Sequence, residues 1–216
     1  MVATPASAKP RLAAEWLALY VAAPGVLALL TARHRWIVLA AIAGGGLLAL
    51  AVYAPARDPA ARQRELPAML ARAGLSLLSL VLLLGLFAQW PSFALPRERP
   101  LVWAGVLLLY GPLSALPQEL LYRMLFFRRY GELFATPAAR VAASAIAFGW
   151  AHVMVHRALV MPLAALAGVL LSITWLRSRS LLLVTLEHTL YGAFVFSAGI
   201  GGMFVNGTRI VSSLLR

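Results

Sequence analysis

A glutamate and an arginine stand four residues apart within an otherwise apolar stretch of this sequence. Glu119 and Arg123 lie in PQELLYRMLFFRR, residues 117–129, among leucine, methionine and phenylalanine. Residues with this spacing share one face of a helix, so the two side chains can form an ion pair. Gln118 adds a carboxamide beside the glutamate. A charged pair in apolar surroundings is costly unless it is satisfied, so this stretch is a candidate functional site.

Two later apolar stretches also carry ionisable side chains. His152 ends the segment AFGWAH, and Glu187 and His188 are adjacent in LLLVTLEHTLYGAF. Because a buried charge without a partner is strongly unfavourable, we expect the three helices to converge and satisfy these groups in one polar cavity.

A carboxylate beside two imidazoles in a partly dry cavity is suited to hydrolysis. The carboxylate can take a proton from water, one imidazole can orient that water or protonate the leaving group, and the other can stabilise an oxyanion. The residues therefore predict general-base hydrolysis without a covalent intermediate.

Each of these groups also has a structural interpretation. Glu119 and Arg123 can close a helix kink as an ion pair. His152 can be a core histidine bonded to a carbonyl of the next helix, and Glu187 with His188 can be a packing pair. The catalytic interpretation is favoured because costly polar groups occur on three successive predicted helices.

Other hydrolytic chemistries lack their residues here. The sequence has no cysteine, no HExxH, no GxGD pair and no GxSxG. We therefore expect no metal and no cofactor. A zinc site is the alternative, because His152 and His156 share one helix face, although no third ligand has matching spacing.

The composition is that of a membrane protein. Of 216 residues, 62% are hydrophobic and 12% charged, against about a quarter charged in a soluble domain. We predict an all-α, polytopic transmembrane bundle of about seven helices. The net charge of +12 comes from arginines at the ends of apolar runs, which fits contact with lipid headgroups and excludes nucleic acid as a partner.

Apolar runs of roughly 20 residues, the length that crosses a bilayer, place the helices. They are expected over residues 15–31, 36–54, 73–89, 101–129, 138–155, 158–176 and 181–199. Residues 55–72 are predicted as a basic surface loop leading into an amphipathic turn. Gly44, Gly45 and Gly46 are expected to allow close helix approach, and Pro112 and Pro117 predict a kink in the fourth helix.

Three short motifs resemble those of the CAAX-protease and bacteriocin-processing (CPBP) family. ELLYR, from Glu119 to Arg123, resembles the motif EExxxR. FGWAH, ending at His152, resembles FxxxH, and HTLYG, from His188 to Gly192, lies where HxxxN or HxxxD is expected. The order and approximate gaps agree over residues 101–199.

This resemblance implies an intramembrane, glutamate-dependent endopeptidase acting on a membrane-associated peptide or protein. A glutamate and His152 would activate water, His188 would lie in the oxyanion hole, and Arg123 would fix the carboxylate. It implies a CPBP-like four-helix catalytic core at residues 101–200, preceded by a leader and three spans at 1–100 and followed by a short tail at 201–216. The location expected is the bacterial inner membrane.

Two positions depart from the family pattern. Gln118 stands where the first glutamate of EExxxR is expected, and Gly192 stands in place of the asparagine. Glu119 is then expected to be the base, with Glu187 as a further candidate. The residues resemble a bacterial subgroup more than a eukaryotic prenyl protease, so a substrate other than a CAAX protein is expected. The alternatives are a non-catalytic immunity or scaffold protein of this fold, and a small transporter or proton relay.

Overall fold

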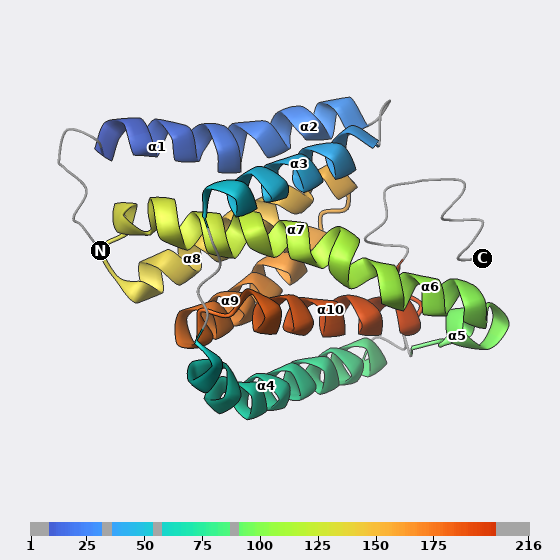
Figure 1. Cartoon of the computed structure of the whole chain (residues 1–216). Helices are drawn as coiled ribbons and strands as arrows, with labels where there is room; N and C mark the ends of the chain where they lie inside the picture. The colour runs from blue at the N-terminus through green and yellow to red at the C-terminus, as the bar shows by residue number, and fades with distance from the viewer. Residues whose placement is uncertain (1–8, 32–35, 54–57, 87–90, 202–216) are drawn as a thin grey trace. The chain divides into compact units, whose positions relative to one another are not determined.

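A computed structural model describes residues 9–31, 36–53, 58–86 and 91–201 of the chain (Figure 1). Within these ranges the structure is helical and contains no strand, which confirms the predicted all-α, polytopic helix bundle. The C-terminal tail predicted at residues 201–216 lies outside the described residues except for Gly201.

The helices follow the order of the predicted spans. They are α1 (Lys9–Leu17), η2 (Ala18–Ala22), α2 (Ala23–Thr31), α3 (Trp36–Val52), α4 (Pro59–Leu86), α5 (Ala94–Glu98), α6 (Pro100–Tyr110), η3 (Gly111–Ala115), α7 (Leu116–Glu119), η4 (Leu120–Tyr130), η5 (Gly131–Leu133), α8 (Pro137–Ala151), η6 (His152–Val155), α9 (Val160–Ser178) and α10 (Leu181–Ser197).

Five helical segments are long and apolar enough to cross a membrane, and two more apolar helices are shorter. All seven lie where the sequence predicted a helix, and five of them meet the length of a membrane span. Leucines on their surfaces, such as Leu29, Leu86 and Leu101, are 80–88% exposed. Such large exposed apolar side chains are stable where the surrounding solvent is lipid.

The fourth predicted span is helical without a break from Pro100 to Leu133. Pro112 stands in the π-helical turn η3, and a second π-helical stretch, η4, follows Pro117. A wider turn of this kind accommodates the missing N–H of a proline. The kink expected at these prolines stays a prediction.

The surface loop predicted for residues 55–72 is wrong from Pro59 onward, because α4 begins there. Asp58 caps the helix, since its Oδ1 accepts a hydrogen bond of 2.8 Å from the backbone N–H of Ala61. Proline is favoured at the first helical position because its fixed φ suits the helix. Glu65, which the sequence placed in this loop, is buried on α4.

The chain divides into two compact units, Met1–Pro55 with Pro117–Ile173, and Ala56–Leu116 with Thr174–Arg216. We call them unit 1 and unit 2. The long helical segment from Pro100 to Leu133 and helix α9 each contribute residues to both units.

In unit 1, helix α3 packs against η4. A Cβ added at Gly46 would lie 3.1 Å from Cα of Pro117, and one at Gly45 would lie 3.3 Å from the Leu121 side chain. Glycines at these two positions let the helix backbones approach closely, as predicted. Gly44 faces open space.

Unit 1 also has an aromatic core around Tyr20. Its ring makes edge-to-face contacts with Tyr122, Phe126 and Tyr130 at centroid distances of 5.5–5.6 Å. Its hydroxyl donates a hydrogen bond of 2.8 Å to the carbonyl of Leu121. The N-terminal helix is thereby fixed to η4, the element that follows Glu119.

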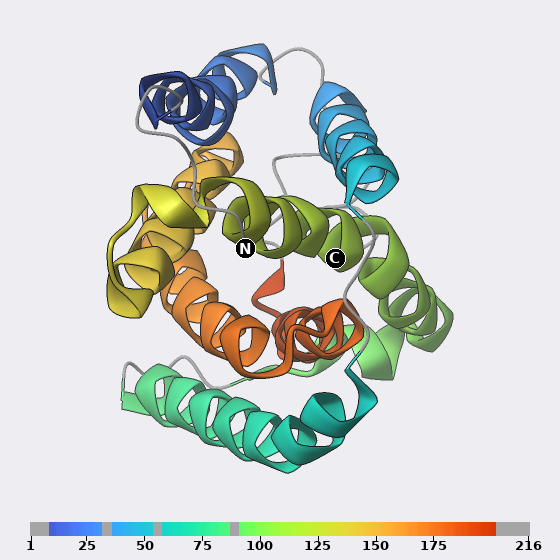
Figure 2. The same cartoon turned by 60° about the vertical axis from the view of Figure 1, so that its left-hand side comes forward.

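In unit 2, helix α4 lies alongside α10, as Figures 1 and 2 show. Met69 and Ala73 of α4 and Leu183 of α10 form the buried apolar contact between them. Helix α6 packs against α10 as well, and the indole N–H of Trp103 donates to Ser197 Oγ at 2.8 Å.

Candidate active site

Glu119 and Arg123 form the buried ion pair that their spacing predicts. Arg123 Nε lies 3.4 Å from Glu119 Oε2, and both side chains are 0% exposed. Glu119 ends α7, and Arg123 lies in the first turn of η4. The carboxylate is therefore held inside the protein beside a fixed positive charge, and it faces neither lipid nor solvent.

Three helical elements of unit 1 supply polar atoms to the guanidinium of Arg123. Its Nη1 donates to the Tyr122 carbonyl at 3.2 Å and to Ser144 Oγ at 3.5 Å, and its Nη2 donates to the Gly168 carbonyl at 3.5 Å. Ser144 Oγ donates to the same Tyr122 carbonyl at 2.8 Å, and Ser172 Oγ donates to Ser144. These bonds fix Arg123, which in turn fixes the carboxylate.

Phe148 contacts both the arginine and His152. The Arg123 Cζ atom is 4.8 Å from the centroid of the Phe148 ring, a cation–π contact. The rings of Phe148 and His152 also meet edge to face, with centroids 4.9 Å apart. The first and second motifs of the sequence are therefore joined in space through one aromatic ring.

The imidazole of His152 is also bound to the backbone of its own helix. Its Nδ1 lies 2.8 Å from the Phe148 carbonyl oxygen. A carbonyl can only accept, so Nδ1 carries the proton and Nε2 of the neutral ring is an acceptor. An acceptor nitrogen on a half-exposed side chain can orient a water molecule.

Helix α8 places these groups on one face. Ser144, Phe148 and His152 are spaced by four residues, and the helix ends at Ala151 immediately before the histidine. Small residues bring α8 close to α9, because a Cβ at Gly149 would lie 2.8 Å from both Ala165 Cβ and the Met161 carbonyl. This close approach brings Gly168 of α9 within reach of Arg123.

Gln118 is half-buried on α7, next to the fully buried Glu119. Neighbouring helical residues point in different directions. The glutamate, and not the glutamine, therefore shares a helix face with Arg123.

His188 is buried on α10 in unit 2. Its Nε2 lies 3.2 Å from the hydroxyl oxygen of Tyr110, and the two rings meet edge to face. Tyr110 ends α6, so the histidine is anchored to a helix far from it in sequence.

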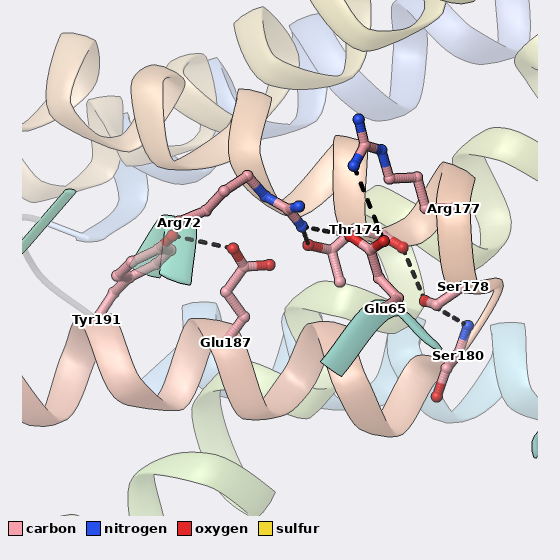
Figure 3. A network of polar contacts seen from close by, with 8 residues as sticks. All are labelled: Glu65, Arg72, Thr174, Arg177, Ser178, Ser180, Glu187 and Tyr191. Atoms are coloured by element: carbon pink, nitrogen blue, oxygen red, sulfur yellow. Dashed lines mark hydrogen bonds and ion pairs between the residues drawn. The ribbon is translucent and has the colours of Figure 1, made fainter. Parts of the chain in front are cut away.

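Glu187, the neighbour of His188, belongs to a different polar cluster of unit 2. It is fully buried, and its Oε1 accepts a hydrogen bond of 3.0 Å from the Tyr191 hydroxyl. Figure 3 shows this pair beside Arg72 of α4. Arg72 Nη2 donates to Glu65 Oε1 at 2.6 Å and to Thr174 Oγ1 at 2.8 Å.

The structure thus brings Glu119, Arg123 and His152 together within unit 1, and it places Glu187 and His188 in unit 2. The common cavity expected for all of them joins residues of both units and stays a prediction. Sequence reasoning missed Ser144 and Tyr110. The four-residue spacing of Ser144 from Phe148 was a usable signal, whereas nothing in the sequence indicates Tyr110.

A family model described as Type II CAAX prenyl endopeptidase Rce1-like matches residues 100–194. Over this stretch, the chain is similar to the CAAX-protease (CPBP) family. The match contains all six candidate site residues, from Gln118 to His188. No curated protein and no solved structure matches the chain.

The similarity to this protease family and the five long apolar helices both indicate a membrane protein. The protein is an integral membrane protein. Within it, the matched stretch covers the long helical segment from Pro100, both helices that pack around Arg123, and most of α10.

Proposed function

We propose that this protein is an intramembrane endopeptidase in which Glu119 activates water for attack on a peptide bond. One observation carries the proposal: the buried Glu119–Arg123 pair is joined through Phe148 to His152, whose imidazole lies at a helix end. A carboxylate, a fixed cation and an imidazole in this order suit hydrolysis, and buried ionisable groups within a membrane protein are commonly functional.

In the proposed mechanism, Glu119 acts first as a base and then as an acid. Glu119 accepts a proton from water while Nε2 of His152 orients the oxygen, which forms a bond to the scissile carbonyl carbon. His188 donates a hydrogen bond to the oxyanion that develops. The C–N bond then breaks, and the proton on Glu119 passes to the leaving amine. Arg123 fixes the orientation of the carboxylate.

The substrate we propose is a peptide or protein associated with the bilayer, and the proposed location is the bacterial inner membrane. Gln118 and Gly192 differ from the family motifs, so we expect cleavage that does not require a prenylated CAAX end. Paired fluorogenic peptides, with and without a prenyl group, separate these substrate classes.

The test is cleavage of these peptides by the full-length protein in proteoliposomes. General-base catalysis contributes about 10²- to 10⁴-fold, so Glu119→Gln and His152→Ala should each lower kcat/KM by at least the lower figure. Glu98→Gln, which changes an exposed glutamate of α5, is the matched control and should cleave like the wild type. Thermal unfolding in detergent verifies that each variant is folded. Wild-type cleavage by folded Glu119→Gln and His152→Ala would remove the mechanism.

Gln118 favours a second candidate, a non-catalytic immunity or scaffold protein of the same fold. A carboxamide stands where the motif has a carboxylate, and an amide cannot act as a base. This candidate predicts that the wild type cleaves no peptide and that its biological activity survives Glu119→Gln and His188→Ala.

A further inference from the structure

We infer that Tyr110 is the positioning residue of His188, and that position 192 is a glycine because the Tyr110 ring occupies the space of a side chain there. The effect that we expect of Tyr110 on cleavage rests on the proposed function, in which His188 stabilises the oxyanion. The contact between the two residues does not, because it is observed directly within unit 2.

Tyr110 makes the polar contact to His188 with its hydroxyl. The hydroxyl oxygen lies 3.2 Å from Nε2, and the ring centroids are 5.9 Å apart at an interplanar angle of 76°. Phe196, two turns further along α10, packs against the tyrosine ring at 5.7 Å. The tyrosine therefore lies along α10 with its polar end at the histidine and its ring held by an aromatic neighbour.

Gly192 provides the space for this ring. A Cβ at this position would lie 2.1 Å from Cε1 and 2.3 Å from Cζ of Tyr110, far inside van der Waals contact. The glycine is in the interior of α10, where its backbone is helical. Its conformational freedom is not needed there, so the reason for a glycine is the missing side chain.

A second glycine allows the same close approach from the other helix. Gly111 follows Tyr110, and a Cβ there would lie 3.2 Å from Oγ1 of Thr189. Thr189 follows His188, so the two helices meet tightly at the level of the histidine. The close approach of the two helices thus holds Tyr110 at the level of His188.

The tyrosine and the residue that the motif HxxxN places at 192 exclude each other. An asparagine could not be added to α10 while the Tyr110 ring stays where it is. The phenolic hydroxyl of Tyr110 supplies a polar contact to the histidine from a helix that lies far away in sequence. If the hydroxyl donates to Nε2, the neutral imidazole carries its proton on Nδ1, so one tautomer is selected.

The first test compares kinetic constants of full-length variants in proteoliposomes. Misplacing a catalytic group by about 1 Å can cost about 100-fold, so Tyr110→Phe should lower kcat by about 10- to 100-fold and leave KM unchanged. Gly192→Asn alone should lose activity, because its side chain meets the ring. The double variant Tyr110→Ala/Gly192→Asn should regain activity relative to Gly192→Asn. Gly105→Ala on α6 is the control, since a Cβ there meets nothing within 4 Å.

The second test needs no cleavage. ¹⁵N spectra of the imidazoles in detergent, with His188 assigned by comparison with His188→Gln, report which ring nitrogen carries the proton. The wild type should show one dominant tautomer for His188, and Tyr110→Phe should show a mixture. Unchanged ¹⁵N shifts in Tyr110→Phe would overturn the inference, as would full activity of Gly192→Asn. A wild type that cleaves nothing but shows the expected shifts would instead overturn the proposed function.

Discussion

Glu119 is a buried carboxylate whose charge is balanced within one turn of its own helix. Arg123 contributes the opposite charge, and Ser144 and two backbone carbonyls accept hydrogen bonds from the guanidinium. A buried pair of this kind adds little net stability over an apolar pair of equal volume, but removing one member leaves an uncompensated charge.

Arg123→Met should therefore destabilise the protein strongly. Breaking a buried ion pair from one side costs about 3–5 kcal/mol, measurable as a lower thermal transition in detergent. Glu119→Gln/Arg123→Met should recover much of this loss, because no charge is then left buried. A single variant as stable as the wild type would contradict the argument.

Gln118→Glu should increase cleavage. It adds a carboxylate at the place where the family motif has its first glutamate, and a general base contributes about 10²-fold or more. We expect kcat/KM to rise by about tenfold or more, relative to a control, Gln63→Glu, on the exposed face of α4. A fall in kcat/KM would show that the second carboxylate disturbs the base.

At the scale of elements, helices α8 and α9 pack closely through small residues, and this packing places Ser144 and Gly168 beside Arg123. Gly149→Ala should destabilise unit 1, since its Cβ would lie 2.8 Å from Ala165 Cβ and from a backbone oxygen. Overpacking of this kind costs about 1–3 kcal/mol. The control is Gly74→Ala on α4, where a Cβ meets nothing within 4 Å and alanine should stabilise the helix by about 0.5–1 kcal/mol. Thermal unfolding in detergent measures both, and equal effects of the two changes would contradict the packing argument.

Helix α4 is held in unit 2 by Arg72, which binds Glu65 and Thr174. Arg72→Met should lower the free energy of unfolding by about 2 kcal/mol, since hydrogen bonds to charged groups are of this size. Arg64→Met, on the same helix but exposed, should have little effect. Chemical or thermal unfolding compares them, and indistinguishable variants would mean that the cluster in Figure 3 contributes nothing to stability.

At the scale of the whole molecule, the proposed chemistry uses side chains alone. The sequence has no cysteine, and the part of the chain that the structure describes has no group of three or more histidine, cysteine, aspartate or glutamate side chains placed to hold a metal ion. We expect EDTA and 1,10-phenanthroline to leave cleavage unchanged. Inhibition that added zinc reverses would instead support the alternative site at His152 and His156.

The sequence by itself determined what depends on local spacing. The lengths of the apolar runs predicted the helices, and the four-residue spacing predicted the Glu119–Arg123 pair. The start of α4 was missed because basic residues 59–72 resemble a surface loop in composition, while the helix depends on the Asp58 cap and on the tertiary partner that Arg72 finds at Thr174.

Only the tertiary structure decided which distant residues meet. Phe148 joins Arg123 to His152, and Tyr110 reaches His188 across 78 positions of the chain. Such contacts depend on how closely two helices approach, and that distance is set by glycines and small side chains on both partners. The residue pattern of a single helix does not contain this distance. For this reason the sequence shows Gly192 only as a departure from the motif HxxxN, whereas the structure shows that the Tyr110 ring occupies the space of a side chain there.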